Sequence, residues 1–113
     1  MSARSKLVRM LPCHCCALEG IDGDSQCGRT EEHHCNEQEL AGHKRVGDHA
    51  SVPLGAWHHR GVTLPGVTRD EMTFRFGPSL ALSQRMFRFT YGHDAQMVAI
   101  TNDKLARLEP ATA

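Results

Sequence analysis

The stretch "HASVPLGAWHHRG", residues 49–61, predicts a strand that leads directly into a helical turn. Residues 49–54 alternate in character as a strand does, and we expect the strand to end at Pro53. Gly61 favours an early end of the turn, because glycine readily adopts the left-handed conformation that follows a helix. The turn carries two adjacent histidines, His58 and His59. Neutral imidazole binds metals and accepts protons near neutral pH, so this pair marks a candidate site.

A second histidine pair, His33 and His34, lies in "RTEEHHC", residues 29–35, which has weak strand character. Neighbouring side chains of a strand point to opposite faces. The two histidines can therefore divide two roles, one binding a metal and the other facing an incoming nucleophile. The same division suits the second pair, with His58 closing a zinc site and His59 facing a catalytic ion.

The chain has five cysteines, and Cys13-x-x-Cys16 places two thiolates where a tight turn can bind one tetrahedral zinc. No apolar signal-peptide core or membrane-length run is present, so we expect a reducing, cytoplasmic setting and no membrane partner. In that setting a cysteine cluster indicates a metal site more often than disulfides. The remaining ligands can come from several residues: His14, Cys15, Cys27, Cys35, or the pair His58 and His59.

With 113 residues the chain has the length of one domain. Only 5% of its residues are aromatic, so a bound metal would help to stabilise a core of this size. Residues 1–42 carry four basic and seven acidic residues, and residues 43–113 carry nine and six. The basic second half permits an anionic partner, but its charge is weaker than that of a dedicated DNA-binding domain.

Helices are predicted at both ends of the chain, which gives an α+β fold class. A short N-terminal helix over residues 2–11 ends at Pro12. Thr68 and Glu71 have the spacing of a capping box and open a helix to residue 77. Two more helices are expected at residues 80–91 and 94–108, and segments 17–32 and 36–48 are expected to be loops.

Two details of the C-terminal helices are specific enough to test. Ser79 is expected to cap the helix over residues 80–91. Its apolar face is expected to consist of Leu82, Met86 and Phe89, with Phe87 and Tyr91 beside them. Asp94 is expected to cap the last helix, and the pair at residues 102–103 is a candidate break in it.

The order of these motifs resembles the His-Asn-His (HNH) endonucleases, which have a ββα-metal motif. Within that group the chain is most similar to the phage recombination-enhancement, RecA-dependent nucleases, over about residues 9–92. The resemblance implies one nuclease domain over residues 1–113, with a small zinc-stapled ββα-metal core and a helical extension at 93–113. The matching residues are Pro12, Cys13, Cys16, His33, His34, Lys44, Asp48, Val52, Pro53, Leu54, His58, His59, Arg60 and Gly61.

The resemblance assigns the catalytic roles to three histidines. His34 matches the general base that deprotonates the attacking water, and His33 and His59 match the ligands of a divalent ion. The implied ion is Mg²⁺ or Mn²⁺, with Zn²⁺ as a further option because two imidazoles suit softer ions.

The resemblance also implies a structural zinc. Cys13 and Cys16 match its first two ligands, and His58 stands where the family often has a zinc-binding cysteine. Gly55 stands where the family often has another cysteine, so one sulfur must come from elsewhere. Cys27 is the first candidate, followed by two others, Cys35 and Cys15.

Four further residues receive supporting roles. Asp48 falls on a recurring acidic position of the intervening loop and is expected to support the metal site from outside its ligand shell. Basic residues beside the histidine pairs are candidates to contact phosphates: Lys44, Arg45 and Arg60.

The function implied by the resemblance is a metal-dependent endonuclease that hydrolyses DNA phosphodiester bonds in phage or prophage recombination. Its partners would be DNA and a RecA-type recombinase filament, in the cytoplasm of a bacterial host. The alternative is a zinc-binding module without catalytic activity that binds DNA or protein. A hydrolase of another substrate is a third option, which no residue pattern favours.

Overall fold

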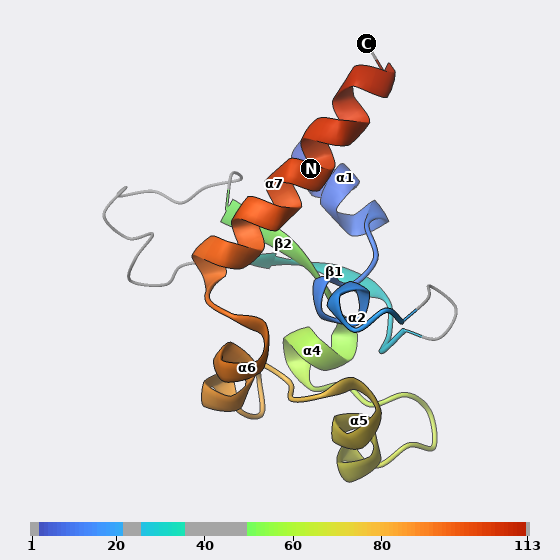
Figure 1. Cartoon of the computed structure of the whole chain (residues 1–113). Coiled ribbons are helices and arrows are strands. Elements are labelled where there is room, and N and C mark those ends of the chain that lie inside the picture. The colour runs from blue at the N-terminus through green and yellow to red at the C-terminus, as the bar shows by residue number, and fades with distance from the viewer. Residues whose placement is uncertain (1–2, 22–25, 36–49, 113) are drawn as a thin grey trace.

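A computed structural model describes residues 3–21, 26–35 and 50–112 of the chain. The described residues form two strands and six helices, an α+β fold as the sequence predicted (Figure 1). The predicted loop with Lys44, Arg45 and Asp48 lies outside the described residues. The described elements are α1 (Ala3–Met10), α2 (His14–Leu18), β1 (Thr30–His34), β2 (Ser51–Gly55), α4 (Ala56–Arg60), α5 (Arg69–Phe76), α6 (Gln84–Tyr91) and α7 (Asp94–Thr112).

Strands β1 and β2 form an antiparallel sheet in which His33 lies opposite Val52. Strand β2 continues through Pro53 to Gly55, so the predicted end at Pro53 was wrong. The backbone N–H of Ala56 donates to the carbonyl of Arg29, and hydrogen-bonded pairs alternate along an antiparallel ladder. Pro53 therefore stands in a pair without ladder hydrogen bonds, where its missing N–H costs nothing.

Helices α1 and α7 lie side by side on one part of the sheet, while α4, α5 and α6 lie beyond its other end (Figure 1). Arg4 of α1 is hydrogen-bonded to both the sheet and α7. Its Nη2 donates to the carbonyl of Ser51 over 2.7 Å, and its Nη1 donates to Oδ1 of Asn102 over 2.6 Å. One side chain thus joins α1, β2 and α7.

The core is centred on β2, whose five residues are all buried. Trp57, the second residue of α4, is fully buried and donates its indole N–H to the carbonyl of Gly77 over 3.0 Å. Gly61 ends α4 with a φ of 74°, as expected for a left-handed glycine cap. The short α4 is therefore held by core packing, because five residues are too few for an independent helix.

Helix α6 differs from its prediction in both its start and its buried face. Ser83, not Ser79, caps it by accepting a hydrogen bond from the N–H of Met86. Phe87 and Tyr91 form the buried face, with ring centroids 5.1 Å apart. The predicted face is exposed, and its residues are Leu82, Met86 and Phe89. Both stripes satisfy helical spacing, and only contact with the rest of the fold selects between them.

Two other local predictions were also wrong. The segment after Pro12, expected as a turn, forms the short helix α2. Helix α7 continues through Asn102 because tertiary contacts outweigh local propensity there. Its neighbour Thr101 is buried, and Asn102 itself binds Arg4.

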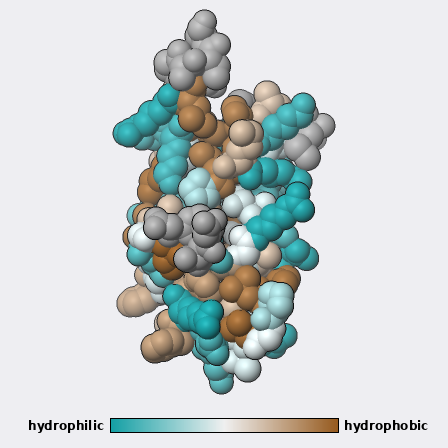
Figure 2. Space-filling model, turned by 90° about the vertical axis from the view of Figure 1, so that its right-hand side faces the viewer, coloured by the Kyte–Doolittle hydropathy of each residue, from teal (hydrophilic) through white to brown (hydrophobic). Residues whose placement is uncertain are grey.

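The surface is mixed in character. Figure 2 shows one face on which hydrophobic residues lie between hydrophilic ones. None of the helices in the described ranges has the length and apolar character needed to cross a membrane.

Candidate metal centres

Four residues predicted as zinc ligands lie together in the core. Cys13 and Cys16 come from the start of α2, Cys27 precedes β1, and His58 lies on α4. All four are fully buried, and one ligand atom from each lies within 4.8 Å of the others. We call these four residues the cysteine cluster. It joins three segments that are far apart in the sequence.

The spacing of the cysteine cluster fits one tetrahedral zinc ion. Zinc bonds of about 2.3 Å to sulfur and 2.0–2.1 Å to nitrogen separate two sulfurs by about 3.8 Å, and sulfur from nitrogen by about 3.6 Å. Nδ1 of His58 lies 3.0 Å from Sγ of Cys27, 3.4 Å from that of Cys13 and 4.0 Å from that of Cys16. The sulfurs of Cys13 and Cys27 are 3.9 Å apart. The donor set could therefore hold zinc.

His58 is oriented by a contact on the far side of its ring. Its Nε2 lies 2.6 Å from the carbonyl oxygen of Phe76. A carbonyl can only accept, so Nε2 carries the proton and donates it there. In a neutral ring Nδ1 then has a lone pair that faces the sulfurs, which is the usual support for a metal-binding histidine.

The electrostatics of the cysteine cluster favour a positive charge at its centre. Hydrogen bonds from Cys15, Cys16 and Cys27 lower the pKa of the Cys13 thiol. Burial lowers the pKa of His58, but hydrogen bonds with Cys13 and Cys27 outweigh burial and raise that pKa to about 10. Thiolate formation and cation binding are therefore linked at this site.

Gly55 leaves the space in which the side chain of Cys27 lies. A Cβ atom built on Gly55 would overlap Sγ of Cys27. The sulfur of Cys27 thus occupies the space that a side chain at residue 55 would need. The side chain of Cys27 can therefore take its place in the cysteine cluster only because residue 55 is a glycine.

The predicted ligands of the catalytic ion, His33 and His59, also lie beside each other. Their ring centroids are 5.1 Å apart and their planes are inclined by 64°. Burial, and secondarily the charge of His59, lowers the pKa of His33 to about 4. His33 is therefore neutral at physiological pH, as a metal ligand must be. Two imidazoles at this separation can reach a common ion.

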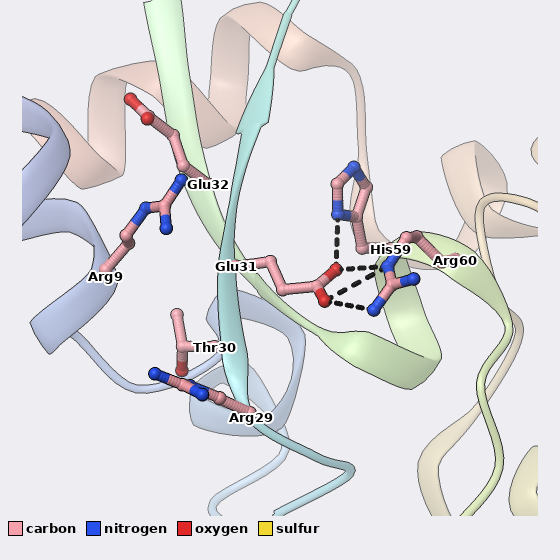
Figure 3. A pocket seen from close by; sticks show the side chains of 7 residues that line it. All are labelled: Arg9, Arg29, Thr30, Glu31, Glu32, His59 and Arg60. Carbon is pink, nitrogen blue, oxygen red and sulfur yellow. Dashed lines mark hydrogen bonds and ion pairs between the residues drawn. The ribbon is translucent and has the colours of Figure 1, made fainter. Parts of the chain in front are cut away.

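Glu31 is a site residue that the sequence analysis missed. It shares the face of β1 with His33, and its Oε1 accepts from Nδ1 of His59 over 2.9 Å (Figure 3). Arg60 also donates to this carboxylate, over 2.8 Å from its Nε, and lowers the pKa of Glu31. With Nδ1 engaged, His59 directs Nε2 toward any ion. The signal was available, because residues two apart on a strand share a face.

His34, the predicted general base, ends β1 and points away from the face of His33 by the alternation of the strand. Its side chain is 61% exposed, and its Nε2 lies 3.6 Å from Oε1 of Glu32. The structure thus places His34 next to His33 in the chain, with its ring open to solvent, and pairs it with a carboxylate of its own face.

A hollow of about 500 Å³ lies along β1, and its lining side chains stand on either side of the strand (Figure 3). Arg60, predicted to contact phosphate, lines it, and so do Arg9 and Arg29, which the sequence analysis did not single out. The remaining lining residues are Thr30, Glu31, Glu32 and His59. Arg60 is already paired with Glu31, so the guanidinium groups of Arg9 and Arg29 are the ones that can receive an anion such as a phosphate beside His59.

The comparisons with known proteins place the chain in a family. No curated protein and no solved structure matches it. A model of the family described as recombination enhancement, RecA-dependent nuclease matches residues 2–106, which is nearly the whole chain. The chain therefore belongs to the recombination-enhancement, RecA-dependent nuclease family.

Proposed function

We propose that the chain is an HNH-type endonuclease that hydrolyses DNA phosphodiester bonds with a divalent ion between His33 and His59. The observation that carries the proposal is the 5.1 Å approach of these two rings beside the arginine-lined hollow. The family's description as a nuclease supports the reaction class. The strand–strand–helix order of β1, β2 and α4 supports the ββα-metal assignment.

In this proposal the divalent ion, once bound, offsets the charge that develops on the phosphate and stabilises the leaving oxygen. His33 and His59 hold it as neutral imidazoles, and Glu31 fixes the tautomer and ring orientation of His59. His34 accepts a proton from the attacking water. Its exposed ring can meet a substrate that lies across the end of β1.

The cysteine cluster would bind a structural Zn²⁺ that holds His59 in place through its neighbour His58. DNA would lie along the hollow, with Arg9, Arg29 and Arg60 on its phosphates. The loop residues Lys44, Arg45 and Asp48 keep their proposed supporting roles. A RecA-type filament as partner and a cytoplasmic location complete the proposal.

Nicking of a supercoiled plasmid by His34→Ala tests the assignment of the base. The assay includes Mg²⁺, Mn²⁺ or Zn²⁺ and a RecA-type filament, because the family is described as RecA-dependent. Removal of a general base reduces the rate about 10²–10⁴-fold. The control is His93→Ala, which removes an exposed histidine outside the proposed site and should nick like the parent chain. Unchanged nicking by His34→Ala would remove His34 as the base.

A zinc-binding module without catalytic activity is the second candidate. It is favoured by one observation, the completeness of the buried cysteine cluster, which needs no substrate to explain it. This candidate predicts zinc binding and no nicking under any of the ions tested, with or without a filament.

A further inference from the structure

A second group of metal-binding side chains lies at the other side of His33. His33 comes from β1, Cys35 follows it, and Asp94 begins α7. One ligand atom from each lies within 4.8 Å of the other two. Cys35 and Asp94 are each 1% exposed, so this is a buried group and not a surface coincidence. We call these three residues the β1–α7 cluster.

The β1–α7 cluster offers imidazole, thiolate and carboxylate, which are the three ligand types that zinc takes in proteins. Among the residues that the structure describes, Nε2 of His33 is buried and has no hydrogen-bond partner. A buried polar atom in that state costs free energy, and a bound ion would remove the cost. The chemistry of the group and the state of His33 point to the same ligand, a cation.

Asp94 also forms an ion pair with Arg88, through its Oδ1. A carboxylate has two oxygens and several lone pairs, so it can accept a hydrogen bond from a guanidinium and bind an ion at the same time. Arg88 would then hold the carboxylate in orientation, as partners of metal-binding carboxylates commonly do.

We propose that Cys35 and Asp94 join His33 as ligands of one zinc-type ion, the ion that the proposed nuclease uses. The catalytic part of this statement rests on the proposed function, while the ligand set stands on the geometry of the β1–α7 cluster. His59, whose ring lies 5.1 Å from that of His33, would be the fourth protein ligand, and zinc can expand to five-coordinate when a water or a phosphate oxygen binds.

The ligand set has a consequence for metal choice. A thiolate favours Zn²⁺, Co²⁺ or Cd²⁺ over Mg²⁺, which prefers oxygen. The ion would also tie the start of α7 to the sheet. The nuclease would therefore be a zinc enzyme with two zinc ions per chain, one in the cysteine cluster and one in the β1–α7 cluster.

The zinc content of the full chain, purified with zinc and dialysed, tests the ligand set. We expect two zinc ions in the parent chain and one each in Cys35→Ala and Asp94→Asn. The control is Ser79→Ala, which removes a buried hydroxyl outside both clusters and should keep two. One zinc in the parent chain, or two in Cys35→Ala, would overturn the ligand set. Circular dichroism melting establishes that each variant is folded.

Cobalt provides a second measurement, because a thiolate bound to Co²⁺ gives a charge-transfer band. With Co²⁺ in place of zinc, this band should weaken in Cys35→Ala and stay unchanged in Ser79→Ala. An unchanged band in Cys35→Ala would exclude this thiolate as a ligand. Plasmid nicking is scored separately. A parent chain that binds two zinc ions but does not nick DNA would overturn the proposed nuclease activity and leave the ligand set standing. A parent chain that nicks DNA with one bound zinc would overturn the ligand set and leave the nuclease activity standing.

Discussion

The cysteine cluster and the His33–His59 pair are two candidate metal centres that differ in how far they are closed. The four donors of the cysteine cluster are fully buried and account for a complete tetrahedral set. His33 and His59 are only partly buried, and His59 lines a hollow that solvent can enter. A closed set of ligands suits structural zinc, and a set with an open position suits catalysis.

The two centres share α4, and this explains why one helix carries two adjacent histidines. His58 points into the core toward the sulfurs, while His59 contacts Glu31 at the surface of β1. Adjacent residues on a helix point about 100° apart, so one short helix can serve both sites. The comparison predicts that variants at the first centre remove the fold and that variants at the second remove activity.

The largest expected effect is the loss of the cysteine cluster. Cys16→Ser, or a strong chelator, should remove the cooperative thermal transition, because structural zinc contributes about 10–16 kcal/mol of apparent binding free energy in small folds. His59→Ala should keep that transition. Circular dichroism melting with zinc analysis makes the comparison. A chelated parent chain with a full transition would show that the cluster does not stabilise the fold.

The next effect concerns the space shared by Gly55 and Cys27. Gly55→Ala should lower the free energy of unfolding by about 1–3 kcal/mol, because its Cβ overlaps Sγ of Cys27. Gly55→Cys combined with Cys27→Ala should restore a fourth ligand and bind zinc again. Urea unfolding of each single variant and of the pair measures their coupling. Additive losses in the pair would mean that the two positions do not share one role.

The residues of the cysteine cluster could be predicted because few arrangements were open. The Cys-x-x-Cys spacing indicated two of them, and the family resemblance, with Gly55 where a cysteine often stands, pointed to His58 and Cys27. The buried face of α6 could not be predicted in the same way. Phe87 and Phe89 both fit a helical stripe, and the packing of Tyr91 against the rest of the fold decided between them.

At the second centre the sequence singled out His33 and His59 but did not indicate that Glu31 and Asp94 lie beside them. Glu31 lies two residues before His33 on a strand, so the shared face was foreseeable once the strand was accepted. Asp94 gave no comparable signal, because it was expected only as the cap of the last helix. In the structure it is the first residue of α7, and its place beside His33 depends on the path of the chain through α5 and α6.

The third test concerns Glu31, whose substitution is expected to lower nicking activity and leave the stability of the fold unchanged. Glu31→Gln weakens the acceptor for Nδ1 of His59, and loss of such a partner typically costs about 10–100-fold in metal affinity or activity. The melting temperature and the zinc in the cysteine cluster should stay unchanged. Glu71→Gln is the control, since it changes an exposed carboxylate paired only with Arg75 in its own helix. Equal nicking by both variants would contradict a positioning role for Glu31.

The smallest expected effect belongs to the arginines of the hollow. Arg29 is exposed and lines the hollow beside the second centre, so we expect its guanidinium to contact a phosphate. Arg29→Gln should weaken DNA binding uniformly across sequences and reduce the slope of log affinity against log salt by about 1. Fluorescence anisotropy with a labelled duplex at several salt concentrations measures that slope. Arg107→Gln, on the exposed side of α7, should leave it unchanged. A slope that changes equally in both variants would mean that the hollow has no special part in DNA binding, and the second centre would then lose its proposed substrate while the first kept its zinc.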